Sequence, residues 1–191
     1  MPLPPPLAPR APLHHRRIDC QGFERSDGLW DIEGRLIDTK AYSFPNHDRG
    51  TIHAGDPVHD LSLRLTIDVG LTIHAAEAVI DASPFCGCPD IASAYGALVG
   101  LTIGPGFRAE ARRRLGGRAG CTHLTELLGP LATTAFQTLH RAREERQDAA
   151  QGQISALIDS CHALRADGPV VAREWPDRAP APDTPRTQRS V

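Results

Sequence analysis

The fold is decided by one alternating stretch, LSLRLTI at residues 61–67. Leucine or isoleucine fills every second position, so these aliphatic side chains all lie on one face of a predicted β-strand. The residues that follow, Asp68-Val69-Gly70, predict a turn into a second strand, LTIHAAEAV at residues 71–79. We therefore expect a β-hairpin with one buried face.

An earlier hairpin is predicted around Asp27-Gly28, which separates two stretches of strand-like composition between Arg17 and Tyr42. Asp-Gly is typical of tight hairpin turns because glycine adopts positive φ angles without steric strain. The first half of the chain is therefore expected to form two hairpins.

Helical patterns follow the strands. Apolar residues recur at helical spacing over residues 90–99, 107–115 and 122–146, with Thr122 as the expected N-cap of the longest helix. The pair Gly129–Pro130 predicts a kink or a restart in that helix, because an interior proline removes a backbone hydrogen bond.

Two further elements are expected near the C-terminus: an amphipathic helix at residues 154–164 and a closing strand at residues 169–172. The strands precede the helices in the chain, which favours an α+β fold. We expect a small antiparallel sheet with helices on one face.

The composition fits one globular domain: 191 residues, of which 40% are hydrophobic and 23% charged. Proline-rich ends predict disordered tails at residues 1–12 and 176–191, which leaves a single α+β domain at residues 13–175. The formal net charge of −2 gives no basic surface of the kind that binds nucleic acid or an anionic membrane. Neither is expected as a partner.

The start of the chain, MPLPPPLAPRAP, lacks the charged and apolar regions of a signal peptide. The sequence also lacks a run of about 18 apolar residues, so no membrane-spanning helix is expected. An odd number of cysteines, five, disfavours a disulfide framework. We expect a cytoplasmic protein whose thiols are free or bound to metal.

Nine histidines and five cysteines, set against only 5% aromatic residues, suggest metal chemistry. Ligand-type residues gather at three junctions between predicted elements: His59 and Asp60, Cys86 and Cys88, and Cys121 and His123. Loops on a rigid scaffold often carry binding residues. The start of a helix also lowers the pKa of a thiol and so favours the thiolate that binds metals.

Simpler interpretations exist for several of these residues. Cys20 is typical of a small buried hydrophobic residue, and a Cys-x-Cys pair is a weaker metal motif than one with two intervening residues. His123 and Glu126 could form only a surface ion pair or part of a helix cap. The role of Cys161-His162 stays open.

Four arginines cluster on the predicted helix at residues 107–115. They either form a solvated face or hold an anionic substrate or partner, because guanidinium groups grip carboxylates and phosphates through two parallel hydrogen bonds. They are Arg108, Arg112, Arg113 and Arg114.

Three stretches resemble a bacterial family known only as domain of unknown function 2889. They are DGLWDIEG at residues 27–34, PVHDLSLRLTID at residues 57–68 and GCTHLTEL at residues 120–127. The resemblance covers roughly residues 16–171 and implies no established activity.

The three ligand-bearing loops are also similar, in order and spacing, to those of iron–sulfur cluster scaffold proteins of the IscU and NifU N-terminal type. This similarity covers about residues 55–139 and implies a three-stranded sheet backed by helices, with the loops converging at one end. The first hairpin would then be an N-terminal addition. Those scaffolds carry a cysteine where His59 stands, and His59 with Asp60 makes a harder, mixed ligand set that favours Zn²⁺ or Fe²⁺ over a cluster.

This similarity implies a mononuclear metal site, with His59 or Asp60, Cys88 and Cys121 as protein ligands. Three protein ligands and one open position are typical of catalytic zinc. A fourth ligand, from His123 or Cys86, would instead close the site and make it structural.

The leading hypothesis is a metal-dependent hydrolase or lyase that acts on a small organic acid. The metal ion would polarise a carbonyl or lower the pKa of water, and Asp60, His123 or Glu126 would carry the proton. Arg25 or Arg64 would hold the substrate carboxylate.

Two alternatives stay open: a non-catalytic metal or iron–sulfur cluster carrier that docks on a protein partner through its helical face, and an interaction domain with a structural metal or none. The sequence has no phosphate-binding glycine loop and no G-x-S-x-G elbow. Nucleotide-binding and serine-hydrolase chemistry therefore have no support.

Overall fold

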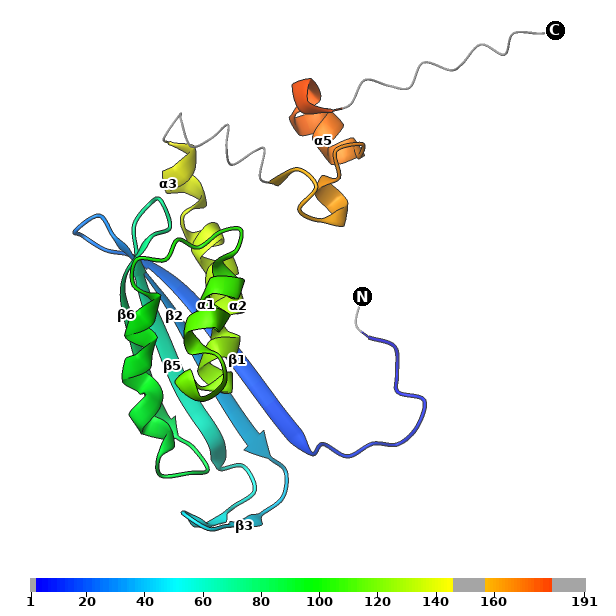
Figure 1. Cartoon of the computed structure of the whole chain (residues 1–191). Helices are drawn as coiled ribbons and strands as arrows, with labels where there is room; N and C mark the ends of the chain where they lie inside the picture. Colours follow the sequence, from blue (N-terminus) through cyan, green and yellow to red (C-terminus); the bar gives the residue numbers. More distant parts are fainter. Residues whose placement is uncertain (1–2, 146–156, 180–191) are drawn as a thin grey trace, which may run out of the picture. The chain divides into compact units, whose positions relative to one another are not determined.

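A computed structural model describes residues 3–145 and 157–179 of the chain. Contacts divide it into two compact units, Met1–His140 and Arg141–Val191. The first unit holds the sheet and its covering helices (Figure 1). No helix among the described residues is long and apolar enough to cross a membrane.

The first unit is built on a four-stranded antiparallel sheet with strand order β1-β2-β5-β6. Its strands are β1 (His14–Glu24), β2 (Trp30–Lys40), β5 (Pro57–Ile67) and β6 (Ile73–Ala82). Both predicted hairpins are confirmed, and β2 pairs with β5 to join them into one sheet. Gly28 adopts φ 83° in the first turn, the left-handed conformation for which the Asp-Gly pair is suited.

A small third hairpin was not predicted from the sequence. β3 (Phe44–Asn46) pairs with β4 (Gly50–Ile52) in the connection between β2 and β5. The side chain of Asn46 accepts hydrogen bonds from the backbone N–H groups of Asp48 and Arg49, which fixes the turn.

Helices cover one face of the sheet, as expected for the α+β class (Figure 1). They are η1 (Cys88–Leu98), α1 (Phe107–Leu115), the short η2 (Gly117–Ala119) and α2 (Thr122–Thr138). Helix α2 packs on β1, β2 and β5, and η1 packs on β6. The alternating aliphatic residues of β5 are buried beneath them, as the period of two predicted.

Two glycines let α2 approach the strands closely. A Cβ atom at Gly34 of β2 would lie 3.0 Å from Leu131 of α2, and one at Gly22 of β1 would overlap the side chain of Thr138. Cys20 lies beside this contact, and burial raises the pKa of its thiol. The position of α2 over β1 and β2 thus depends on two positions without a side chain.

Of the two outcomes predicted at Gly129–Pro130, a restart is wrong, because α2 runs through both residues and ends at Thr138. Pro130 costs one backbone hydrogen bond, but the buried leucines on either side, Leu128 and Leu131, each stabilise the helix by about 1.5–3 kcal/mol. The helix also begins one residue earlier than expected, with Cys121 and not Thr122 at the N-cap position.

The predicted helix at residues 90–99 is a 3₁₀ helix, η1. Its two buried residues, Tyr95 and Leu98, are three positions apart. A helix with three residues per turn places such a pair on one face, so the tighter helix buries both.

The second unit contains α3 (His140–Glu144), which begins at the last residue of the first unit, then η3 (His162–Leu164), α5 (Pro169–Glu174) and η4 (Pro176–Arg178). The expected closing strand at residues 169–172 is wrong, since these residues form α5 and bury Val171. Part of the expected helix at residues 154–164 lies outside the described residues; Leu157 is helical, and the residues from 158 to 164 form turns, bends and η3.

Candidate metal centre

Three neighbouring strands bring a row of polar side chains to the helix-covered face of the sheet. Asp38 of β2 is the direct cross-strand partner of Arg16 on β1 and of His59 on β5. Nε and Nη2 of Arg16 donate to the two carboxylate oxygens of Asp38, each at 2.8 Å. Asp38 is only 2% exposed, so this bidentate pair holds a buried carboxylate in one orientation.

Two histidines of the sheet also contact this carboxylate. Nδ1 of His59 lies 3.1 Å from Oδ2 of Asp38, and Nε2 of His14 lies 3.3 Å from Oδ1. Both oxygens of Asp38 therefore have basic groups on more than one side.

The first turn of α2 completes the group from above the sheet. Nε2 of His123 lies 3.8 Å from Oδ2 of Asp38, and the rings of His123 and His59 have centroids 3.7 Å apart. Three residues further along α2, Glu126 accepts a 2.7 Å hydrogen bond from Nη1 of Arg16. Arg16 thus links the strands to the helix by binding two carboxylates at once.

Backbone irregularities flank His59. The pairing register of β2 with β5 shifts between Asp38 and Thr39, and that of β5 with β6 shifts between Asp60 and Leu61. Bulges of this kind bend a strand and redirect its side chains, and they are frequent next to functional sites.

Charge and burial set the protonation of the group. Burial opposes the charge of Asp38, but the hydrogen bonds and the charge of Arg16 outweigh it and hold the pKa of this carboxyl below its usual range. Burial, and then the neighbouring His123, lowers the pKa of His59. Burial, and then Arg16, lowers the pKa of His123. An ionised carboxylate and two neutral imidazoles, the forms that bind metal ions, are favoured near pH 7.

The spacing of these three groups suits a metal ion. One ligand-type atom from each of Asp38, His59 and His123 lies within 4.8 Å of the other two. In a tetrahedral zinc site with bonds of about 2.0–2.1 Å, ligand atoms are about 3.3 Å apart. The distances of 3.1 and 3.8 Å from the Asp38 oxygen bracket this value. In the described part of the chain, no other three such residues come this close.

An open pocket of about 480 Å³ borders the two histidines. All four predicted ligands, His59, Cys88, Cys121 and His123, line it. Sγ of Cys121 lies 4.0 Å from Nδ1 of His123, the ring nitrogen that faces away from Asp38. The two cysteines therefore lie beside the group of three, on the wall of the same pocket.

Tyr95 fixes the loop that carries Cys121. Its hydroxyl contacts the backbone carbonyl of Cys121 at 2.7 Å, the side chain of Thr125 at 2.7 Å and the backbone N–H of Cys121 at 3.2 Å. The ring is fully buried, so η1 holds the first turn of α2, and with it His123, at a defined place.

A family model described as a protein of unknown function, DUF2889, matches residues 14–137. The chain belongs to this family. The match includes every residue of the group around Asp38 and ends before the second unit. Neither a curated protein nor a solved structure matches the chain, so the similarity to iron–sulfur scaffold proteins has no support.

Within the region matched by the family, Asp60 lies apart from the group around Asp38. As the neighbour of His59 on β5 it projects from the opposite face of the sheet, where Arg35 binds both of its oxygens at 2.7 and 2.6 Å. The alternation that buries the leucines of β5 thus separates the two adjacent candidate ligands.

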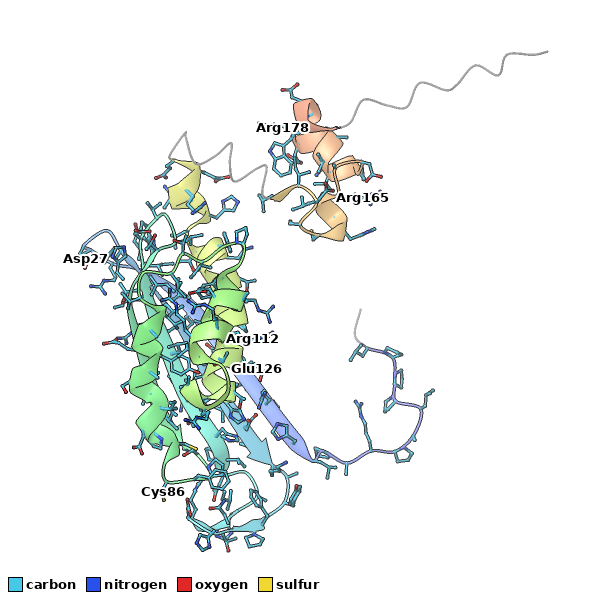
Figure 2. The ribbon with its side chains drawn as sticks, viewed as in Figure 1. Asp27, Cys86, Arg112, Glu126, Arg165 and Arg178 are labelled. Carbon is cyan, nitrogen blue, oxygen red and sulfur yellow. The ribbon has the colours of Figure 1, made fainter. Side chains whose placement is uncertain are left out.

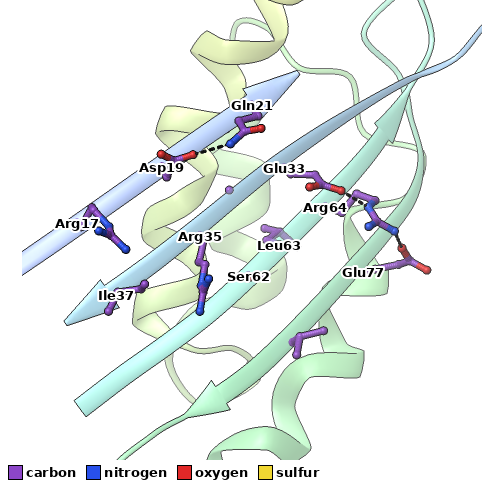
Figure 3. A pocket seen from close by; sticks show the side chains of 12 residues that line it. Arg17, Asp19, Gln21, Glu33, Arg35, Ile37, Ser62, Leu63, Arg64 and Glu77 are labelled. Carbon is purple, nitrogen blue, oxygen red and sulfur yellow. Dashed lines mark hydrogen bonds and ion pairs between the residues drawn. The ribbon is translucent and has the colours of Figure 1, made fainter. Parts of the chain in front are cut away.

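The two arginines expected to hold a substrate also lie elsewhere. Arg64 projects from the uncovered face of the sheet and binds Glu33 and Glu77 (Figure 3). Arg25 lies at the first hairpin turn and binds Asp27 and Asp31. The structure does not bring either of them to the pocket of His59 and His123.

The remaining cysteines lie outside the pocket as well. Cys86 is exposed, and its backbone N–H donates to the side chain of Asp48. Cys161 is exposed in the second unit.

Sequence reasoning missed Asp38, Arg16 and His14. A signal for Asp38 does exist, because it continues the series Ile32, Gly34 and Leu36, whose side-chain positions all lie on the buried face of β2. A carboxylate whose side chain alternates onto the buried face of a strand requires hydrogen-bond donors or cations beside it. The sequence does not show that Arg16 and His59 are these partners, because both contacts depend on how the strands are aligned in the sheet.

Proposed function

We propose that this protein binds one divalent metal ion, Zn²⁺ or Fe²⁺, through Asp38, His59 and His123. The observation that carries the proposal is the convergence of one carboxylate and two imidazoles from β2, β5 and α2. Two histidines and one carboxylate with open positions are typical of catalytic zinc and non-haem iron sites.

The surroundings favour a catalytic site over a purely structural one. His59 and His123 line an open pocket, so a metal ion held by them would retain a face toward solvent. Such an ion would polarise a carbonyl or lower the pKa of a water molecule. We propose a metal-dependent hydrolase or lyase that acts on a small organic acid.

Arg118 is the residue proposed to bind the substrate carboxylate. It lines the same pocket as His59 and His123 and forms no ion pair within the described part of the chain. A guanidinium there can hold a carboxylate through two parallel hydrogen bonds. Arg118 takes the role that the sequence suggested for Arg25 and Arg64.

A second candidate function is a non-catalytic metal carrier in a reducing cytoplasm. The observation that favours it is the position of Cys88 and Cys121 on the pocket wall beside the histidines. Thiolates there would offer soft ligands to an ion in transit to a protein partner. Oxygen-sensitive colour after anaerobic reconstitution with iron and sulfide would support this candidate over the enzyme.

Metal analysis tests the proposed site directly. Protein purified without chelators should contain about one equivalent of zinc or iron, and chelator-treated protein should bind one Zn²⁺ in competition with a chromophoric chelator. His123→Gln should weaken Zn²⁺ binding at least tenfold, because it removes one of three ligands. Absence of saturable binding in the wild-type protein would refute the proposal.

His74→Gln is the matched control. His74 lies 2.8 Å from Asp68, so it repeats the histidine–aspartate pair of the site without a second histidine in the group. This variant should keep wild-type affinity for Zn²⁺. Turnover of carboxylate esters or hydroxy acids by the loaded protein, lost in His123→Gln, would then establish the enzyme.

A further inference from the structure

A second cavity, of about 450 Å³, lies between α1 and the first turns of α2. Arg108 and Arg112 of α1 line one side, and Thr122 and Glu126 of α2 line the other. Figure 2 labels Arg112 and Glu126, which project from these two helices. The volume falls within the range of about 300–1,000 Å³ that is typical of small-molecule sites.

The arginines of α1 divide into two pairs with different roles. Arg113 and Arg114 both bind Glu110, and these bonds lower the pKa of Glu110 to about 2. The side chains of Arg108 and Arg112, one helical turn apart, form no ion pair or hydrogen bond within the described part of the chain. The two arginines without a partner are the two that face the cavity.

The acid that lines the cavity does not neutralise these arginines. Glu126 accepts its 2.7 Å hydrogen bond from Arg16, on the side of α2 that faces the sheet. The lining therefore combines two guanidinium groups with one carboxylate that already has a cationic partner. An anion that entered would meet a net positive charge.

We propose that this cavity binds an oxyanion, the phosphate or carboxylate group of a small ligand, between the guanidinium groups of Arg108 and Arg112. Each guanidinium presents a planar fork of N–H donors that matches two oxygens of such a group. Thr122 lines the same cavity, and its hydroxyl is a further donor of the kind that an oxyanion accepts. The site needs no metal ion and is independent of the function proposed above.

Its position relative to the metal centre has a chemical consequence. Thr122 lines both this cavity and the pocket of His59 and His123. The start of α2 therefore borders both the proposed anion site and the pocket of the candidate metal centre. A ligand whose anionic end is bound by Arg108 and Arg112 could extend its other end toward the pocket of His59 and His123.

Titration with inorganic phosphate and with succinate, at constant ionic strength, tests the proposal. The measurement is the shift of the backbone amide resonances of Gly116, Gly117 and Gly129, which line the cavity. At least one of the two anions should shift them in a saturable manner. Phosphate alone would indicate a phosphorylated ligand, succinate alone a carboxylate ligand, and either result supports the site.

The double variant Arg108→Gln, Arg112→Gln should weaken this binding at least tenfold. The control is the double variant Arg17→Gln, Arg113→Gln, which removes the same amount of charge from two positions outside the cavity, one of them on α1. It should change the affinity for the anion less than twofold. His123→Gln should retain anion binding whether or not metal binding fails. Absence of a saturable shift with both anions, or equal losses in the two double variants, would overturn the proposal.

Discussion

The imidazole rings of His59 and His123 lie almost face to face, with centroids 3.7 Å apart and planes tilted by 30°. His59 lies near the start of β5, an inner strand of the sheet, and His123 lies in the first turn of α2. Two protonated imidazoles at this distance would repel each other, and both have lowered pKa values. The surroundings of the pair therefore favour two neutral imidazoles.

This arrangement predicts how the metal-free protein responds to acid. The usual pKa of histidine is about 6.5, and the folded state lowers it for both residues. The unfolded chain then binds protons first as pH falls, so stability is full above about pH 6.5 and declines below it. Asp38, whose pKa is also lowered, stays ionised in this range.

Thermal unfolding in the presence of a chelator, between pH 8 and pH 5, measures this decline. His123→Gln should flatten the pH dependence of stability. The substitution removes one titrating imidazole, and it removes the neighbouring charge that lowers the pKa of His59. An identical pH dependence in the variant and the wild-type protein would contradict the assignment.

Asp38→Asn should lower the free energy of unfolding by about 2–4 kcal/mol. Asp38 is 2% exposed, and the amide replaces one oxygen that accepts from Arg16 by a donor, so the bidentate pair is broken even though Arg16 keeps its bond to Glu126. Urea denaturation measures the loss. Asp68→Asn breaks a more exposed aspartate–histidine pair and should cost about 1 kcal/mol or less; equal losses would show that burial of Asp38 is unimportant.

Tyr95→Phe should reduce both stability and metal affinity. Without the hydroxyl, the backbone N–H of Cys121 loses its partner, which costs about 1–2 kcal/mol. His123 follows two residues later, so looser placement of this turn should weaken Zn²⁺ binding several-fold. Tyr42→Phe, at an exposed ring, is the control and should alter neither quantity. Unchanged Zn²⁺ affinity in Tyr95→Phe would show that Tyr95 of η1 does not position His123 for metal binding.

Alanine substitutions at two glycines should have opposite signs. Gly34→Ala places a methyl group 3.0 Å from the side chain of Leu131 and should cost about 1–3 kcal/mol, because this buried side chain must move within a packed contact. Gly129→Ala lies inside α2 with no atom within 4 Å of the new methyl group, and should stabilise the protein by about 0.5–1 kcal/mol. Urea denaturation distinguishes the two, and destabilisation by both would contradict the packing described for α2.

The alternation of residues 61–67 and the Asp27-Gly28 turn were sufficient to predict the two hairpins of the four-stranded sheet, because side chains on a strand alternate between faces whatever surrounds them. Helical spacing located α1 and α2 for the same local reason. Local rules failed where burial outweighed them. Pro130 stays inside α2, and residues 169–172 are helical, because neighbouring side chains gain more from packing than the backbone loses.

The sequence alone identified His59 and His123 as ligand-type residues and placed them at element boundaries. Only the tertiary structure added Asp38 and separated Asp60, because cross-strand register decides which side chains of three strands share a row and a face. The same register brought Arg16 to Asp38, and the packing of α2 brought His123 to His59. Contacts between residues far apart in the chain have no local signal, so the candidate centre emerges only when the sheet and α2 come together.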